Sequence, residues 1–318
     1  MQRNLALELV RVTEAAALAA ARENGRGDEM APERAATEAI GKTFPTIAVH
    51  GEVVVGDPQE HPGDLLAAGS RLGDNGEEVD IAVDPLEGAT SCALGGPNAM
   101  SIMALATQGG FLRCPSHTYM EKIATTGDAR GVVDLEKTPT ENLIALAELR
   151  GVYVEDLTVI VLDRPRHDGL IEEVRGAGAR VRLIPHGDVA AAMAAARDGN
   201  DVDVLLGTGG ASQGILSAAA IKCMGGFIQC RFKPRNQGET NALYEAGIND
   251  IDAKFEANDM VGGDVLFAAT GVTNGEYLLG VNFFKGGAKS HSVVMRSNSR
   301  TVRLLETYHS FDYQPVYD

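Results

Sequence analysis

The sequence has no tryptophan, and only 5% of its residues are aromatic. Its four cysteines form no CxxC pair and do not have the spacing of zinc ligands. No apolar run reaches the roughly 18 residues that a membrane helix needs, and the amphipathic N-terminus lacks the apolar centre of a signal peptide. We therefore expect no disulfide framework, no zinc site and no membrane segment, and we predict a protein of the reducing cytoplasm.

Positive charge is also scarce. The chain has 28 lysines and arginines against 44 aspartates and glutamates, which gives a formal net charge of −16. Such a surface repels phosphate backbones, so it argues against a nucleic acid as partner. An anionic small molecule therefore needs a local arginine cluster, a helix N-terminus or a bound metal to hold it.

Glycine and apolar residues are abundant. Of 318 residues, 37 are glycine and 44% are apolar, which is enough for a large core in a loop-rich α/β protein. In the first half, helical periodicity predicts a helix over 3–23 and another from about Pro32. Alternating or wholly apolar runs predict strands over 46–57, 78–84 and 96–107, the second of which ends at Asp84-Pro85 before a loop.

The second half has a different rhythm, in which strands and helices alternate as in βαβ units. Strands are predicted over 157–163, 180–185 and 202–210, and helices over 140–149, 167–177, 187–198 and 211–224. Later strands are expected over 262–275 and 278–284, with one closing strand over 289–309. Because the rhythm changes near 150–157, we predict two lobes, residues 1–152 and residues 153–318.

Carboxylates recur in loops that follow predicted strands or helices. Oxygen ligands at strand ends suit Mg²⁺ or Mn²⁺, which also bind water and substrate phosphate. An acidic protein has acidic loops in any case, so one such residue alone indicates little. The segment Asp84-Pro-Leu-Glu87-Gly is more specific, because its proline and glycine fix the backbone around two converging carboxylates. The full set is Asp28, Glu29, Glu33, Asp57, Asp84, Glu87 and Asp188.

Three short segments are candidate anion sites. The loop Arg164-Pro165-Arg166-His167 holds two arginines in an acidic protein, and a solvated loop is its equal alternative. The run 207–210 separates a strand from a helix whose free N–H groups can face an anion, and it matches neither a P-loop nor a dinucleotide-binding fingerprint. In the turn 186–188, the final aspartate either caps the next helix or binds sugar hydroxyls.

The chain resembles the class II fructose-1,6-bisphosphatases in a series of motifs that follow the order seen in that family. The motifs are GRGD (25–28), VDIAVDPLEG (79–88), GGPNA (95–99), YMEK (119–122), LTVIVLDRPRH (157–167), GDVAA (187–191), GTGGASQG (207–214), ATGVTNG (269–275) and SRTVR (299–303). The resemblance covers nearly the whole chain. It implies the α/β sugar-phosphatase fold shared with inositol monophosphatases, layered α-β-α-β-α, in two lobes with the site between them. It also implies a divalent metal and a homo-oligomer, either a dimer or a tetramer.

The resemblance further implies roles for individual residues. The family uses a threonine directly after the DPxEG glycine to activate the attacking water, with help from a lysine in the first loop. The metal, Mg²⁺ or Mn²⁺, would be held at the positions of Glu33, Asp57, Asp84, Glu87 and Gln213. The substrate would be held at Glu87, Gly88, Ala89, Tyr119, Arg164, Pro165, Arg166, His186, Gly187, Asp188 and Gly210.

Several of these positions depart from the family pattern. The substrate positions are largely retained, whereas the metal carboxylates and the water-activating groups differ. Loss of a group that handles the proton of the attacking water typically costs about 10²–10⁴ in rate. The departures are Glu29 for Lys, Glu33 for Asp, Asp57 for Glu, Ala89 for Thr, His186 for Asp and Gln213 for Glu.

This pattern leads us to expect a retuned enzyme. The leading hypothesis is a Mg²⁺-dependent transferase that acts on a phosphorylated or pyrophosphorylated ketohexose, with an acceptor such as a nucleobase in the place of water. Glu29 or His186 would be the general base, and Glu87, Ala89 and Thr90 complete the predicted catalytic positions. The first alternative is an ordinary fructose-1,6-/sedoheptulose-1,7-bisphosphatase with altered ligands. The second is a non-catalytic protein that binds sugar phosphates.

Overall fold

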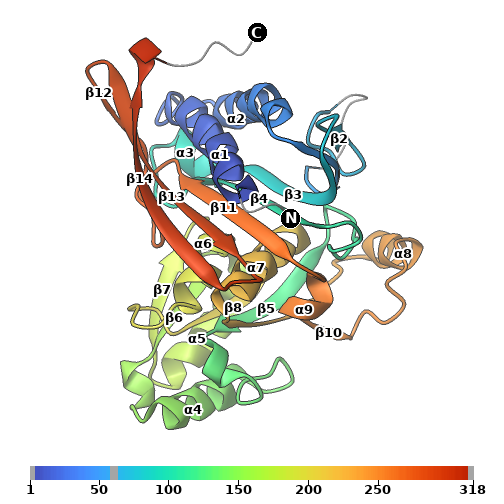
Figure 1. Cartoon of the computed structure of the whole chain (residues 1–318). Helices are drawn as coiled ribbons and strands as arrows, with labels where there is room; N and C mark the ends of the chain where they lie inside the picture. The colour runs from blue at the N-terminus through green and yellow to red at the C-terminus, as the bar shows by residue number, and fades with distance from the viewer. Residues whose placement is uncertain (1–3, 58–63, 314–318) are drawn as a thin grey trace. The chain divides into compact units, whose positions relative to one another are not determined.

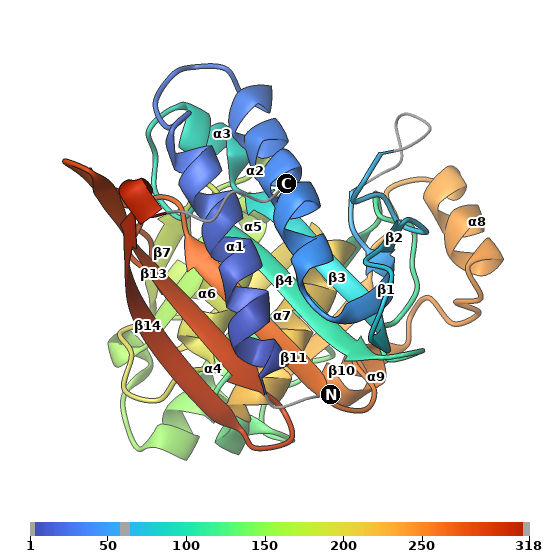
Figure 2. The same cartoon turned by 45° about the horizontal axis from the view of Figure 1, so that its top comes forward.

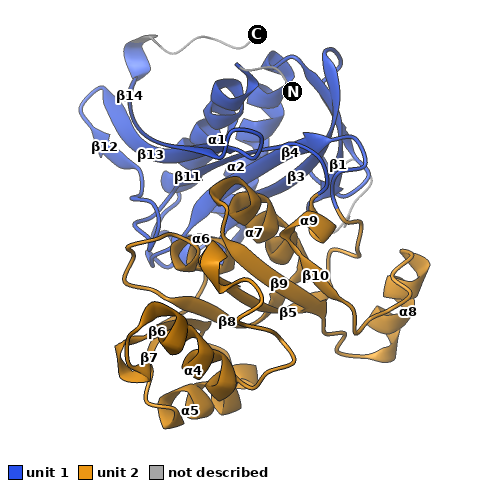
Figure 3. Ribbon diagram, turned by 60° about the horizontal axis from the view of Figure 1, so that its bottom comes forward, with its two compact units in different colours: residues 1–111, 262–318 blue, residues 112–261 orange. Residues whose placement is uncertain are grey.

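The computed structural model describes residues 4–57 and 64–313, which fall into two compact units (Figure 3). Unit 1 contains residues 1–111 and 262–318, and unit 2 contains residues 112–261. The predicted division between residues 152 and 153 therefore falls inside unit 2 and coincides with neither boundary. The physical reason is that late strands return to the first sheet, and such long-range pairing leaves no trace in a local sequence pattern.

Unit 1 is built on one mixed sheet with the strand order β12-β13-β11-β4-β3-β1-β2, and β14 also pairs with β13. The strands are β1 Val49–Val55, β2 Arg71–Leu72, β3 Glu77–Glu87, β4 Met100–Thr107, β11 Val265–Gly271, β12 Asn282–Phe284, β13 Gly287–Arg296 and β14 Thr301–Ser310. Its helices are α1 Leu5–Ala21, α2 Met30–Thr43 and α3 Ala89–Ala93.

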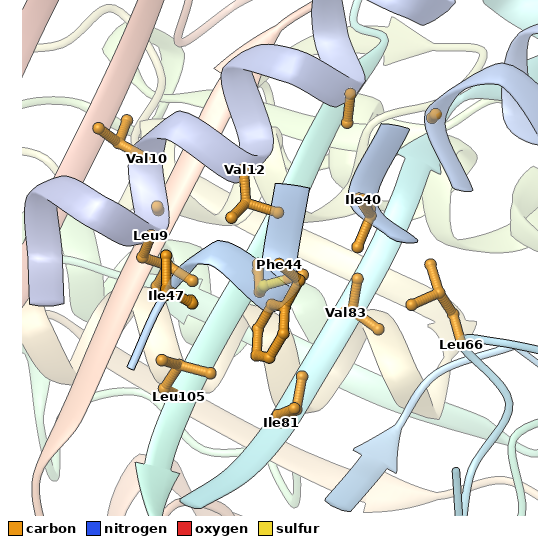
Figure 4. Close-up of a cluster of buried hydrophobic side chains, with 14 of the residues drawn as sticks. Leu9, Val10, Val12, Ile40, Phe44, Ile47, Leu66, Ile81, Val83 and Leu105 are labelled. Carbon is orange, nitrogen blue, oxygen red and sulfur yellow. The ribbon is translucent and has the colours of Figure 1, made fainter. Parts of the chain in front are cut away.

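Helices α1 and α2 pack against each other and lie on the same face of this sheet, α1 along β11 and β13 and α2 along β3 (Figure 1 and Figure 2). Side chains of both layers meet in a buried cluster (Figure 4), in which Leu9 of α1 and Ile40 of α2 face Ile81 and Val83 of β3. Ile81 and Val83 are two residues apart, so they point to the same face of the strand. Burial of this face fixes the position of the strand whose end carries the predicted metal carboxylates.

Hydroxyl groups tie α1 to the same sheet. Thr13 Oγ1 and Thr270 Oγ1 share a hydrogen bond of 2.9 Å, and Thr270 Oγ1 is 2.9 Å from Ser292 Oγ. The buried carboxylate of Glu14 accepts from Thr307 Oγ1 over 2.7 Å and from Ser292 Oγ over 3.4 Å. This network connects one helix to strands β11, β13 and β14.

Two predicted strands of unit 1 differ from the structure. β3 does not stop at Asp84 but continues through Pro85 to Glu87, because a bulge takes up the change of register in this segment. The single strand predicted over 289–309 is a hairpin of β13 and β14. Its turn lies at 297–300, where Arg300 takes a left-handed conformation with φ +46°.

Unit 2 contains a second sheet with the order β10-β9-β5-β8-β6-β7. Its strands are β5 Tyr119–Thr125, β6 Thr158–Leu162, β7 Arg180–Ile184, β8 Val204–Gly210, β9 Phe227–Phe232 and β10 Lys254–Glu256. Its helices are α4 Pro139–Arg150, α5 Asp168–Gly176, α6 Asp188–Ala195, α7 Ala211–Met224, α8 Gln237–Glu245 and α9 Ala257–Met260. Helices α4 and α5 cover one face of the sheet and α6 and α7 the other (Figure 3).

The βαβ prediction for unit 2 is confirmed, since β6 is parallel to both β7 and β8. The predicted α/β class is confirmed as well. Unit 1 supplies a helix layer and a sheet, and unit 2 supplies a sheet between two helix layers, which are the layers that the family resemblance implies. Across residues 4–57 and 64–313, no helix is both long enough and apolar enough to cross a membrane.

Candidate active site

The segment that carries Asp84 and Glu87 ends β3 and begins α3. The register against β4 shifts between these two carboxylates, so a bulge separates them. Gly88 follows with φ +83°, a left-handed conformation that glycine adopts without strain, and it starts the helix at Ala89. Glu87 is buried, with 5% of its surface exposed. The bulge and the glycine thus place both carboxylates and Ala89 at one end of the strand.

Asp57 lies at the same end of the sheet. β1 and β3 are parallel neighbours, with Val55 opposite Ala82, and Asp57 and Asp84 each follow two residues later. A bridge to Ala67 holds the backbone of Asp57. Because parallel strands end at the same edge, this register brings the two aspartates to one edge of the sheet.

Glu29 and Thr90 are in direct contact. Thr90 Oγ1 donates a hydrogen bond to Glu29 Oε2 over 3.1 Å, which joins the first turn of α3 to the residue that precedes α2. The loop before Glu29 runs along α3, where the N–H groups of Gly25 and Gly27 donate to carbonyl oxygens near the end of that helix over 2.9 Å. Glu33 follows four residues after Glu29, one turn further along α2. Thr90 therefore places a hydroxyl beside the loop that precedes α2, although position 89 is an alanine.

The predicted metal ligands of unit 1 supply only carboxylate oxygens, the donor type that Mg²⁺ and Mn²⁺ prefer. Among residues 4–57 and 64–313, no three His, Cys, Asp or Glu side chains are grouped closely enough to hold a metal ion. The fifth predicted ligand, Gln213, is on α7 in unit 2. The donor chemistry fits the ion, and the ligand set stays a prediction.

In unit 2, two arginines surround the ring of Tyr119 at the start of β5. The guanidinium carbon of Arg166 is 5.2 Å from the ring centroid, and that of Arg235 is 4.2 Å from it. Arg235 is paired with Glu239, whereas Arg166 donates only to the carbonyl oxygen of Thr208 and forms no ion pair within the described part of the chain. The cluster therefore has an excess of positive charge in a protein of strongly negative net charge.

Arg164 is held by backbone oxygens. Its Nη1 donates to Asp163 O over 2.8 Å and its Nη2 to Pro185 O over 2.7 Å. Pro165 begins the short 3₁₀ helix η4, Pro165–His167, in which a proline's missing N–H costs no hydrogen bond. Since both contacts are to neutral groups, the charge of Arg164 is available to an anion.

The glycine-rich segment 207–210 forms the end of strand β8, so it is not a loop between the strand and α7. It packs closely against side chains, and a Cβ would be crowded at three of its positions. At Gly207, where φ is +145°, it would come within 3.1 Å of the ring of His167. At Gly209 it would meet Asp188, and at Gly210 it would meet Gln213. In the sheet, Tyr119 lies opposite Gly210. The structure thus brings together the predicted substrate residues of β5, the arginine loop and the segment 207–210.

In the turn 186–188, the structure excludes one of the two roles considered for Asp188, that of a helix cap. Gly187, with φ +98°, is the N-cap of α6, so Asp188 does not cap that helix but forms its first residue. The Asp188 carboxylate forms a buried ion pair with Lys122 of β5, which is 1% exposed. His186 precedes the cap.

Sequence reasoning missed two groups of this cluster. Lys122 lies in the YMEK motif but was not singled out, although a lysine within a strand needs a buried partner. Arg235 lies in Lys233-Pro-Arg235, which repeats the arrangement of Arg164-Pro-Arg166. That repetition of two cations around a proline is the signal that could have identified it.

Unit 1 has carboxylates at strand ends, and unit 2 has arginines beside a glycine-rich strand end. These are the residue types of a metal-assisted phosphate-ester enzyme. The pattern that defines the family "Bacterial fructose-1,6-bisphosphatase, glpX-encoded" matches residues 3–309. The chain belongs to this family, so the resemblance predicted from its motifs is confirmed.

Individual relatives are similar over almost their whole length. The chain is 39% identical over 338 residues to the D-fructose 1,6-bisphosphatase class 2/sedoheptulose 1,7-bisphosphatase of Synechococcus elongatus, covering 98% of each chain. It is 38% identical over 341 residues to the protein of the same name from Thermosynechococcus vestitus, covering 99% of this chain and 98% of the relative.

These comparisons overturn the transferase hypothesis. The relatives carry the bisphosphatase name that was the first alternative, and their similarity extends through both units. The transferase was inferred from a few substituted positions, chiefly Ala89. Such local changes do not outweigh similarity along the whole chain, and Thr90 still supplies a hydroxyl at the adjacent position.

Proposed function

We propose that the chain is a divalent-metal-dependent phosphatase that hydrolyses one phosphate ester of a ketose bisphosphate, either fructose 1,6-bisphosphate or sedoheptulose 1,7-bisphosphate. The observation that carries this proposal is the similarity to class 2 bisphosphatases across 98% of the chain. The excess positive charge around Tyr119 supports a doubly phosphorylated substrate, because one phosphate can be held there while the other reacts.

In this proposal, the non-reacting phosphate binds at the arginine cluster. Arg166 and Arg235 neutralise its charge by donating from planar guanidinium groups. The Tyr119 hydroxyl and the N–H groups at the start of α7 add neutral donors. Asp188 and the backbone of the turn at Gly187 orient the sugar hydroxyls.

The reacting phosphate would bind where the predicted carboxylates hold the metal. Mg²⁺ or Mn²⁺, when bound, supplies charge neutralisation and a more acidic water. Glu29 accepts a proton from the water as the water oxygen bonds to phosphorus and the ester P–O bond breaks, and the departing sugar oxygen takes up a proton from solvent. Thr90 orients the Glu29 carboxylate through its hydrogen bond. The ligands for the ion would be Glu33, Asp57, Asp84, Glu87 and Gln213.

The test is phosphate release from fructose 1,6-bisphosphate and from sedoheptulose 1,7-bisphosphate, with Mg²⁺ or Mn²⁺. We expect release of one phosphate per molecule, abolished by Glu87→Gln and by removal of the metal. Fructose 6-phosphate serves as the control substrate that should not react. Tight metal-independent binding of the bisphosphate without turnover would contradict the proposal and favour a sugar-phosphate-binding protein.

We further propose that the reaction takes place in the reducing cytoplasm. All four cysteines are free thiols, and three are buried. Burial raises the pKa of Cys92 to about 11 and that of Cys223 and Cys230 to about 12, so these groups stay protonated and unreactive. We also retain the homo-oligomer as a proposal, which light scattering of the purified protein would test.

A further inference from the structure

One residue, Thr208, links the arginine loop to the glycine-rich end of β8. The carbonyl oxygen of Thr208 accepts from Arg166 Nε over 2.9 Å and from Arg166 Nη2 over 2.8 Å. The N–H of the same residue points to His167 Nε2 at 2.8 Å. Arg166 and His167 therefore both hold the backbone of Thr208 by hydrogen bonds.

These contacts determine the protonation of the His167 ring. A backbone N–H can only donate, so Nε2 must be the acceptor and cannot carry a proton. The proton is on Nδ1, which donates to the carbonyl oxygen of Leu162 over 2.7 Å. The neutral ring thus satisfies both contacts, and 3% of the residue is exposed.

The ring of His167 packs directly against the end of β8. The ring of His167 occupies the space that a Cβ on Gly207 would need. Tyr119, whose ring is flanked by Arg166, lies opposite Gly210 in the same pair of strands. The position of the Thr208 backbone therefore sets how Arg166 and Tyr119 face one another.

We propose that His167, in its neutral Nδ1–H form, is a positioning residue for the phosphate site of unit 2. It holds the end of β8, residues 207–210, against the arginine loop and thereby sets the affinity for the substrate's non-reacting phosphate. This inference rests on the proposed function only for the identity of the ligand, since the contacts themselves are within unit 2. His167 acts on the phosphate site through Thr208.

Protonation of the ring would disrupt this arrangement. Nε2 would become a donor facing the Thr208 N–H, so one of the two contacts would be lost. Burial holds the pKa of His167 below its ordinary value of 6.5; the bond to Leu162 raises it, and the charges facing the ring oppose each other, since Arg166 lowers the pKa and Asp188 raises it. The unfolded chain therefore takes up the proton at a higher pH than the folded one. The free energy of unfolding is therefore expected to fall as the pH drops below about 6.5, whereas phosphate affinity is expected to fall only at the lower pH at which the folded ring takes up its proton.

Two substitutions separate the contacts. His167→Gln can place an amide oxygen near the position of Nε2 and so accept from Thr208, whereas His167→Asn can place an amide N–H near Nδ1 and so keep only the bond to Leu162. Leaving the Thr208 N–H without an acceptor is expected to weaken binding of fructose 1,6-bisphosphate by about fivefold or more. We expect this loss in His167→Asn, with affinity close to that of the natural protein in His167→Gln.

The measurements are calorimetric binding of fructose 1,6-bisphosphate without metal, and KM and kcat with metal, each from pH 5.5 to 8. We expect KM to change in His167→Asn with kcat nearly constant, and the natural protein to lose affinity at acid pH more steeply than His167→Gln, which does not titrate. Melting temperatures identify any variant that is not folded. Equal affinities of folded His167→Asn and the natural protein, or identical pH profiles of His167→Gln and the natural protein, would overturn the inference. Absence of turnover with intact binding would instead count against the proposed phosphatase alone.

Discussion

At the scale of single residues, Ala89 is the departure from the family pattern that we expect to affect the rate of phosphate release most. It is the first residue of α3 and directly follows Gly88. Ala89→Thr adds a hydroxyl where the family has one, so we expect phosphate release to rise by about tenfold or more. The measurement is kcat for fructose 1,6-bisphosphate with Mg²⁺ or Mn²⁺.

The matched control for this change is Ala89→Val, which adds the same volume without a hydroxyl. We expect no gain from it. An equal gain in both variants, or none in Ala89→Thr, would show that the hydroxyl lost at this position does not limit hydrolysis and that the Thr90–Glu29 contact already suffices.

Arg235 is one of the two residues of the unit 2 cluster that the sequence analysis did not predict. Because its guanidinium group lies 4.2 Å from the Tyr119 ring centroid, we expect Arg235→Gln to raise KM for the bisphosphate by about tenfold, with a smaller effect on kcat. The control is Glu239→Gln, which removes the partner of Arg235 but keeps the positive charge. A KM that rises equally in both variants would assign Arg235 a structural role at the start of α8.

At the scale of elements, α1 is held to its sheet by polar as well as apolar contacts. Glu14→Ala leaves the hydroxyls of Thr307 and Ser292 without their buried acceptor, so we expect the free energy of unfolding to fall by about 1–3 kcal/mol. Glu14→Gln keeps an acceptor oxygen and should cost less. Urea unfolding followed by circular dichroism measures both. Equal stability of Glu14→Ala and the natural protein would contradict this role of the network.

Most elements were predictable because their apolar residues recur at one period. The helices over 3–23 and 211–224 and the strands over 157–163 and 202–210 agree with α1, α7, β6 and β8 to within a few residues. β5 was missed because Glu121 and Lys122 interrupt its apolar run, and Lys122 is buried only through a partner 66 residues away. The β13–β14 hairpin was missed although the run Ser-Asn-Ser at 297–299 is a turn signal.

The residues of the candidate site were predictable from the sequence, whereas the contacts between them were not. Motifs located Asp84, Glu87, Tyr119 and the arginine loop, because each motif is contiguous in sequence. The contacts between motifs, such as Thr90 with Glu29 and His167 with Thr208, depend on packing between segments 41 to 61 residues apart. Local patterns contain no information on such distances, so the partners of these residues came only from the structure.

At the scale of the whole molecule, unit 1 is assembled from two segments that unit 2 separates in sequence. β4 pairs with β3 on one side and with β11 on the other, and α1 packs against both β11 and β13. The two segments also meet at their ends, where Gly262 N donates to Gly110 O over 2.6 Å. Neither segment therefore contains a complete sheet or core for unit 1.

This arrangement predicts how the chain can be divided. Residues 1–111 alone lack β11, which pairs with β4, and β13, which packs with β11 against α1. We therefore expect them to show no cooperative unfolding transition. Replacing residues 112–261 with a few glycines should instead give a folded unit 1, because Gly110 and Gly262 are already adjacent and a short loop adds little closure entropy. Thermal melts followed by circular dichroism test both forms. A cooperative melt of residues 1–111 alone would mean that the early strands and helices suffice, and that the returning strands only extend a sheet that is already stable.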